Sequence, residues 1–343
     1  MGTLNKGVMM IDKNHVTLKN IAEAAGVSIS TVSHVINNTR FVKKETRENV
    51  ENVMESLSFS MGKGHSKKMK YLGLIVADIT EDYSISVIKS IENRCEEVGL
   101  SIIVCDSQDN LDIEHQNINK LLDNDRIVGI IISPVNSEEC NPRLVKTKLP
   151  VVCIDRKLVK AKKIFFGINN LQSGSFATEY LHDNGCTSIG FIGYPVEIYS
   201  VNQREMGYEL AWRNCNRANE PHVLRIAYFQ KDAVEKITQF IKKNRLDGLI
   251  CATSGVCRLV VEAIEEMDLS IPENIKIVSY DDNKWFNYLK YPISVITQPV
   301  KDIAEASVNM ILKLTDGINC PKDETSEVLL QTGFIDRLNK KEE

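Results

Sequence analysis

The spacing of apolar residues near the start of the chain predicts a short helix that ends in a tight turn. Over residues 17–25, apolar side chains recur at intervals of three, one and three, which places on one helix face Leu18, Ile21, Ala22 and Ala25. Thr17 is a good N-cap for this helix, and Gly26 can adopt the left-handed conformation that ends it.

Residues 28–37 predict a second helix, for which Ser28 is the N-cap. Its inward side is apolar and consists of Val32, Val35 and Ile36. Its outer side is small and nearly uncharged, and consists of Ile29, Ser30, Ser33, His34 and Asn37, with Thr31 near the helix start. Such a face suits the major groove of DNA, whose base edges present donors and acceptors. A third helix over 45–57 completes the domain, and the alternative is a helix hairpin in an ordinary domain.

From residue 71 onward, apolar runs alternate with helix-like stretches in two series. The first series has strand-like runs at 72–76, 102–104, 128–132 and 151–154, and helix-like stretches at 84–98, 112–123 and 138–147. The second has strand-like runs at 188–192, 224–228, 248–252 and 275–280, and helix-like stretches at 171–184, 200–216, 233–243 and 255–267. This alternation predicts an α/β core of two doubly wound lobes, each a parallel sheet covered by helices. Two unrelated α/β domains are the alternative.

Charge separates the start of the chain from the rest. The 343 residues carry a net charge of −4, yet residues 1–70 hold eleven Lys or Arg against six Asp or Glu. The head is therefore +5 and the remainder −9. A basic head on an acidic body fits a protein that neutralises DNA phosphates at one end, and its affinity should depend on salt. A solvated basic tail is the alternative.

Other chemistry is sparse. The sequence has no apolar run of membrane-spanning length, and residues 1–14 lack a signal-peptide pattern, so we expect a cytoplasmic protein without membrane contact. The nine cysteines form no C-x-x-C pair and the six histidines show no ligand spacing. We therefore expect buried free thiols and neither a metal site nor a cofactor.

The motif at residues 16–33, Val-Thr-Leu-x-x-Ile-Ala-x-x-Ala-Gly-Val-Ser-x-x-Thr-Val-Ser, resembles the DNA-binding head of the lactose-repressor (LacI/GalR) family of bacterial transcription regulators. Asn37-Asn38 and the run 44–47, Lys-Glu-Thr-Arg, extend the resemblance. The remainder is similar to the family's core, which has the periplasmic-binding-protein type I fold.

The resemblance implies three parts: a helix-turn-helix domain at 15–58, a linker at 59–70 and an effector-binding and dimerisation core at 71–338. In the core, lobe 1 covers about 71–166 and 300–322, and lobe 2 about 167–299 and 323–338. The chain would cross between the lobes three times, with 300–316 returning to the first lobe and 327–334 to the second.

By the same resemblance, the DNA contacts are Thr17, Leu18, Ser28, Ile29, Ser30, Thr31, Ser33, His34 and Asn37. Ile29, Ser30 and His34 occupy the positions that select the operator, whereas Thr17, Thr31, Ser33 and Asn37 suit phosphates. His34 stands where the family most often has arginine, so it can donate one bond to guanine but not a bidentate pair.

The linker departs from the family, which usually has a short hinge helix after a Pro-Asn pair, with a leucine that wedges into the minor groove. Here the segment is about four residues shorter and carries two glycines and several lysines, without that proline or leucine. We expect a flexible, phosphate-attracting linker.

In open parallel sheets, ligands bind beyond the carboxyl ends of the strands. That rule, with the resemblance, gives the effector-binding candidates Asp78, Tyr83, Ser133, Asp155, Arg156, Arg204, Thr253, Asp281 and Gln298. Carboxylate acceptors, guanidinium donors and a flat aromatic ring are what a sugar or related polar metabolite requires. Thr253-Ser254 replaces the family's usual Asn-Asp, which puts an ordinary hexose or pentose in doubt.

These features predict a homodimeric, effector-controlled transcription regulator, a repressor, that reads a pseudo-palindromic operator in double-stranded DNA. Two heads are needed because one buries little surface. The alternatives are a regulator that uses a protein corepressor, an exported transport receptor, and an enzyme-like sensor core with weak DNA specificity. An enzyme would use the cleft acids Asp78, Asp106, Asp155 and Asp281, to which no motif assigns a role.

Overall fold

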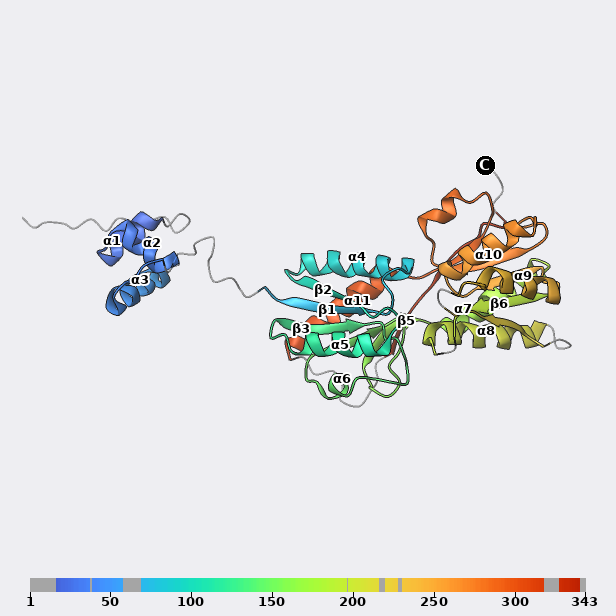
Figure 1. Ribbon diagram of the computed structural model, residues 1–343, viewed down its shortest axis with the longest axis horizontal. Coiled ribbons are helices and arrows are strands. Elements are labelled where there is room, and N and C mark those ends of the chain that lie inside the picture. Colours follow the sequence, from blue (N-terminus) through green and yellow to red (C-terminus); the bar gives the residue numbers. More distant parts are fainter. Residues whose placement is uncertain are drawn as a thin grey trace, which may run out of the picture. The chain divides into compact units, whose positions relative to one another are not determined.

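The computed structural model describes residues 17–37, 39–57, 69–195, 197–215, 220–227, 230–317 and 327–339. Contacts within the chain divide it into two units, residues 1–69 and 70–343 (Figure 1). The buried apolar clusters of the described residues each lie within one of these units. The predicted linker at 59–70 lies outside the described residues except for Met69 and Lys70.

The first unit contains three helices, α1 (Leu18–Ala25), α2 (Ile29–Asn37) and α3 (Lys44–Ser56). Thr17 caps α1, since its Oγ1 accepts a hydrogen bond from the backbone of Asn20 at 3.4 Å. Gly26 has a φ of +68°, and its backbone N–H bonds the carbonyls of the last turn, as the turn pattern predicts. The core of this unit consists of Ile21, Ala22, Ala25, Val32, Val35 and Val50.

The first lobe of the second unit is a six-stranded parallel sheet in the order β11-β5-β4-β3-β1-β2. Its strands are β1 (Tyr71–Val76), β2 (Ser101–Asp106), β3 (Ile127–Ile132), β4 (Val151–Ile154), β5 (Ile164–Ile168) and β11 (Glu327–Leu330). One face is covered by α4 (Asp82–Glu97) and α11 (Val300–Thr315), and the other by α5 (Leu111–Leu122) and α6 (Pro142–Lys146) (Figure 1).

The second lobe has the sheet order β12-β10-β9-β8-β6-β7, in which β12 alone is antiparallel to its neighbour. Its strands are β6 (Ile189–Gly193), β7 (His222–Arg225), β8 (Gly248–Cys251), β9 (Lys276–Tyr280), β10 (Ser294–Thr297) and β12 (Gly333–Ile335). Its helices are α7 (Asn170–Asp183), α8 (Tyr199–Cys215), α9 (Ala233–Asn244) and α10 (Ser254–Glu266), followed by the 3₁₀ turn η1 (Lys284–Tyr288). The prediction of helices alternating with strands in two doubly wound lobes is confirmed.

The chain crosses between the sheets three times, after β5, after β10 and between β11 and β12. The assignment of 327–334 to the second lobe was wrong for its first half, because β11 pairs with β5 of the first sheet. Only the part after Gln331 and Thr332 joins β10 in the second sheet. A Cβ on Gly333 would lie 2.5 Å from Oγ1 of Thr297, so glycine is what lets β12 approach β10.

Three strands also differ from the sequence pattern. The strands β5 and β10 were not predicted, and β5 continues to Ile168, two residues past the expected lobe boundary. β7 covers His222–Arg225 rather than 224–228. In the described part of the chain, no helix is long and apolar enough to cross a membrane.

The helices α7 and α8 approach each other closely at two glycines. A Cβ on Gly174 would lie 2.1 Å from the carbonyl oxygen of Arg204, and one on Gly207 would lie 2.0 Å from that of Leu171. Because both neighbours are backbone atoms, no side-chain rotation can relieve such contacts. This packing fixes the position of Arg204, on the inner side of α8.

Candidate functional site

The outer face of α2 carries hydroxyl groups, some of which also cap the N-terminus of the helix. Ser28 and Ser30 are exposed, and Ile29 is 49% exposed. The Oγ of Ser28 accepts from the backbone N–H of Thr31 at 3.1 Å and lies 2.8 Å from the Oγ of Ser30. The predicted cap is thus confirmed, and the same hydroxyls remain at the surface.

The other predicted DNA contacts are placed less uniformly. Thr17 is exposed, Thr31, Ser33 and His34 are half-buried, and Leu18 packs partly against the core of the head. Nothing is described for the side chain of Asn37. Only part of Leu18 is therefore open to a ligand.

A basic loop follows α2 and leads into the start of α3; residues 44–47 entered the family resemblance, but no residue at 39–47 was predicted to contact DNA. His34 Nδ1 lies 2.9 Å from Oγ1 of Thr39, which ties the loop to the helix. Beyond Thr39, a surface hollow of about 590 Å³ is lined by Arg40, Phe41, Val42, Lys44 and Arg47. Phe41 is 91% exposed. The clustering of arginine and lysine at 40–47 was the available signal.

In the core, all nine predicted effector candidates line one cavity between the two lobes: Asp78, Tyr83, Ser133, Asp155, Arg156, Arg204, Thr253, Asp281 and Gln298. Seven of them lie within two residues of a strand end, in agreement with the rule that selected them. The cavity holds about 40 Å³, room for little more than a water molecule. A sugar-sized ligand can enter only if the lobes separate or side chains move.

Arg204 occupies the second-lobe wall of the cavity and is 2% exposed. Its Nε donates to Oδ1 of Asn170 at 2.8 Å, and its Nη1 donates to the carbonyl oxygen of Ala252 at 2.6 Å. The guanidinium carbon lies 3.9 Å from the ring centre of Tyr280, a cation–π contact. The Nη2 group has no hydrogen-bond partner among the described residues, so one donor remains for a ligand.

Asp155 and Asp281 occupy equivalent positions, each directly after a strand in its own lobe. Both have left-handed backbones, with φ values of +56° and +65°. Asp281 Oδ1 accepts from Nε2 of Gln298 at 2.8 Å. Burial raises the pKa of Asp281 to about 6, although Arg204 and Gln298 favour its charged form.

Arg156 is held on the first-lobe side by carboxylates. Its Nη1 lies 3.0 Å from Oδ1 of Asp109, and its Nε lies 3.7 Å from Oδ2 of Asp155. Both partners are mostly buried, so the pair is shielded from solvent.

Tyr83 contributes a second unused donor. Its hydroxyl is buried and has no hydrogen-bond partner in the described part of the chain. Burial, together with the charges of Asp155 and Asp281, raises its pKa well above the usual value, so the hydroxyl keeps its proton. It can donate to a ligand oxygen.

Glu81 and Asp82, at the start of α4, reach from the first lobe to the second. The hydroxyl of Tyr194 donates to Oε1 of Glu81 at 3.4 Å, and Nδ2 of Asn283 donates to Oδ2 of Asp82 at 3.1 Å. Oδ2 of Asp82 also lies 4.0 Å from Nη2 of Arg258. These contacts join the lobes in this arrangement.

Glu81 also lines the cavity, together with Ala77, Ser84, Ile198, Ser200 and Val201, and none of these was predicted. Its pKa is raised to about 7, chiefly by burial and then by the charge of Asp78. A carboxylate two residues upstream of Tyr83, between two predicted residues, was the available signal. Asp106 does not belong to the cavity, because its Oδ1 accepts the backbone N–H groups of Ile79 and Gln108 at 3.1 Å.

Thr253 stands where the family usually has asparagine, and here its side chain caps a helix. Its Oγ1 accepts from the backbone N–H of Val256 at 3.2 Å and caps α10. The neighbouring Ser254 hydroxyl points to the first lobe and lies 3.5 Å from Oδ2 of Asp82.

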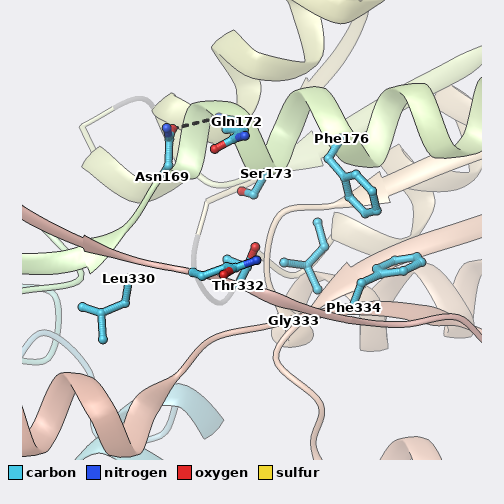
Figure 2. Close-up of a pocket in the computed structure, with 10 residues that line it drawn as sticks. Asn169, Gln172, Ser173, Phe176, Leu330, Thr332, Gly333 and Phe334 are labelled. Carbon is cyan, nitrogen blue, oxygen red and sulfur yellow. Dashed lines mark hydrogen bonds between the residues drawn. The ribbon is translucent and has the colours of Figure 1, made fainter.

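A second hollow, of about 270 Å³, lies at the crossover between the lobes (Figure 2). Figure 2 shows Phe176 of α7 and Phe334 of β12 facing each other, with ring centres 4.9 Å apart. On its α7 side, Asn169 Oδ1 accepts from the backbone N–H of Gln172, and the Ser173 hydroxyl lies 2.8 Å from that of Tyr280. Part of the wall is the crossover at Gln331 and Thr332, so its shape follows the angle between the lobes.

Comparison with known proteins gives matches in both units. The lacI family of bacterial regulatory proteins matches residues 17–61, and the periplasmic binding protein-like domain matches residues 178–338. The HTH-type transcriptional repressor PurR of Histophilus somni is 28% identical over 305 residues, which cover 87% of this chain and 91% of that protein. The sucrose operon repressor of Pediococcus pentosaceus is 28% identical over 328 residues, which cover 92% of this chain and 98% of that protein.

Solved structures show the same fold. The lac repressor dimer bound to operator and the anti-inducer ONPF has a TM-score of 0.71 at 21% identity, covering 94% of this chain and 98% of that chain. The matches in both units, the helix-turn-helix and the two-lobed core all lead to one assignment. The chain is a member of the lacI family of bacterial regulatory proteins.

Proposed function

We propose that the protein is a homodimeric repressor that binds a pseudo-palindromic operator through α2. Its affinity for the operator changes when a small polar metabolite binds between the lobes. The main support for this proposal is that one chain contains both an exposed helix-turn-helix face and a polar cavity lined by residues of both lobes. As a regulator, it binds the metabolite without converting it, and it acts in the cytoplasm, where the DNA is.

Within the head, specificity is assigned to Ile29, Ser30 and His34, which lie on the outer side of α2. Ile29 offers an apolar contact for a thymine methyl, and the other two offer hydrogen bonds to base edges. The arginines and lysines at 40–47, in the loop after α2 and the first turn of α3, supply phosphate contacts that hold α2 in register.

Effector control is assigned to the cavity, because its contents connect the two lobes. The contacts of Glu81 and Asp82 with the second lobe hold the lobes together, and the small volume excludes a sugar in this arrangement. A ligand therefore binds a different lobe arrangement, and this difference in affinity is what shifts the equilibrium between DNA-binding states.

The decisive experiment is selection of bound sequences from random duplex DNA by the purified protein, repeated at two salt concentrations. We expect a pseudo-palindrome with half-sites about one helical turn apart that survives the higher salt. Enrichment of no sequence at all, with binding that disappears at the higher salt, would contradict a specific repressor.

Replacing His34 by alanine should change sequence preference more than general affinity. The ring can donate one base contact, and loss of one such contact costs about 1–3 kcal/mol at one position of the site. Titration of selected operator and random duplex with the wild type and H34A measures the ratio of the two affinities. Equal losses on both DNAs would show that His34 acts only through its bond to Thr39, for which Thr39→Val is the matched control.

A further inference from the structure

The cavity between the lobes has an excess of negative charge. Four carboxylates line it, Asp78, Glu81 and Asp155 from the first lobe and Asp281 from the second, against the two guanidinium groups of Arg156 and Arg204. The excess of two negative charges is concentrated in a space of about 40 Å³, where solvent screening is weak.

Apart from Arg258, whose charge favours the ionised form of Glu81, the protein's own groups compensate little of this excess. Arg156 is shared between Asp155 and Asp109, which itself brings a further negative charge. Asp78 accepts from Thr80, Glu81 from Tyr194 and Asp281 from Gln298, and these donors are all neutral.

The environment of these carboxylates opposes their ionisation. Burial raises the pKa of Glu81 to about 7; the charges of Asp78 and Asp281 add to the effect, and that of Arg258 opposes it. Burial likewise raises the pKa of Asp281 to about 6; Arg204 and Gln298 oppose this rise, and the charges of Asp155 and Asp82 add to it. A bound cation would lower the cost of keeping these groups charged.

Two buried donors favour a ligand that also brings oxygen. Nη2 of Arg204 and the hydroxyl of Tyr83 both lack partners among the described residues, and both residues line the cavity. A hydroxyl, ring or carbonyl oxygen would satisfy them, whereas an ammonium group alone would not.

We propose that the effector carries a protonated amino group together with several hydroxyl groups, as a hexosamine or a polyhydroxylated amine does. The carboxylates of Glu81 and Asp281 receive the ammonium group from the two lobes, and Arg204 and Tyr83 donate to the oxygens. Sugar phosphates and sugar acids are excluded by the same charges. This inference rests on the proposed function of the cavity as the effector site.

The test is calorimetric titration of the full-length protein at pH 7 with matched sets of sugars in the gluco, galacto and manno configurations. Each set contains the neutral hexose, the corresponding hexosamine and the hexose phosphate. We expect at least one hexosamine to bind about tenfold or more tightly than its neutral counterpart, since bonds to charged groups are worth about 1.5–3 kcal/mol. No hexose phosphate should bind better than its neutral counterpart.

The variant Glu81→Gln separates charge from shape, because glutamine keeps the size of the side chain and an acceptor oxygen. In E81Q the affinity for the hexosamine relative to that for the neutral hexose should fall about tenfold, because only the hexosamine gains from the charge. Glu96→Gln, an exposed position on the same helix, is the control and should leave the preference unchanged.

Tighter binding of a neutral or phosphorylated sugar would overturn the proposal, as would a hexosamine preference that survives in E81Q. Failure of every hexosamine to bind a protein that still selects its operator would also overturn it. In that last case the repressor function stands, because operator selection is measured independently.

Discussion

Replacing Gly207 by alanine is expected to destabilise the core by about 3 kcal/mol or more, the upper end of the range for overpacking. The new Cβ would lie 2.0 Å from the carbonyl oxygen of Leu171 and 2.9 Å from the backbone nitrogen of Ser175. Since both are backbone atoms of α7, the helices have to separate. Urea unfolding followed by the fluorescence of Trp212 and Trp285, both in the second lobe, measures the change.

Met206→Ala is the matched control, because Met206 precedes Gly207 on α8 and is 47% exposed. We expect this change to stay within about 1 kcal/mol. Gly174→Ala should behave like Gly207→Ala, since its Cβ would lie 2.1 Å from the backbone oxygen of Arg204. Unchanged stability in both glycine variants would show that α7 and α8 do not pack this closely.

The second large expected effect is that the core becomes more stable as the pH falls from 8 to 5.5. Burial raises the pKa of Glu114, which is 1% exposed, from 4.5 to about 7. Between these values the folded state holds a proton that the unfolded state has released, so the free energy of unfolding decreases as the pH rises. Glu114 alone accounts for about 2 kcal/mol over this interval, because pH 5.5 lies about 1.5 units below its folded pKa and each unit is worth about 1.4 kcal/mol.

Glu81 and Asp281 act in the same direction, since their pKa values are raised to about 7 and about 6. His222 acts in the opposite direction, because burial lowers its pKa and the unfolded state takes up the proton first. Because three carboxyl groups have raised pKa values and His222 is one group, the net effect is greater stability at lower pH. The groups with lowered pKa values, such as Asp232, affect stability only below about pH 4.

Urea unfolding at pH 5.5 and pH 8 tests this pH dependence, with Glu114→Gln as the diagnostic variant. The amide oxygen can still accept from the backbone N–H of Val135, which Glu114 Oε2 now does at 2.7 Å. E114Q should therefore be more stable than the wild type at pH 8 and nearly equal at pH 5.5. A wild type that is more stable at pH 8, or a variant with the same pH slope, would contradict the assignment.

The helix-turn-helix could be predicted from the sequence because the residues that define it lie close together in the chain. Thr17, Gly26 and Ser28 each act within a few residues of their own position, as caps or as a turn. The spacing of Val32, Val35 and Ile36 likewise fixes which face of α2 is buried, without reference to the rest of the chain.

Most residues of the effector cavity could also be predicted from the sequence, because a general rule places ligand sites at the ends of strands. Asp155 and Asp281 follow buried strands, so the position of each strand located each residue. Glu81 was missed because it follows no strand directly and its role comes from Tyr194, which is 113 residues away along the chain. Its place between two predicted residues was a local signal for the cavity, but no local pattern reports its contact with Tyr194.

The sequence likewise could not predict that residues 327–335 divide between the two sheets. The strands β11 and β12 are short, and their partners β5 and β10 are more than 35 residues away. Pairing over such distances depends on which sheet edge is open after the rest of the lobe has formed.

The sequence by itself determined the helix-turn-helix, the two-lobed α/β class and the strand-end residues of the cavity, because each depends on periodicity or on chemistry a few residues apart. Only the tertiary structure decided the sheet of β11, the close packing of α7 on α8 and the excess of carboxylates in the cavity. Those properties arise where residues distant in sequence come into contact, and their energies depend on burial that the chain acquires only when it folds.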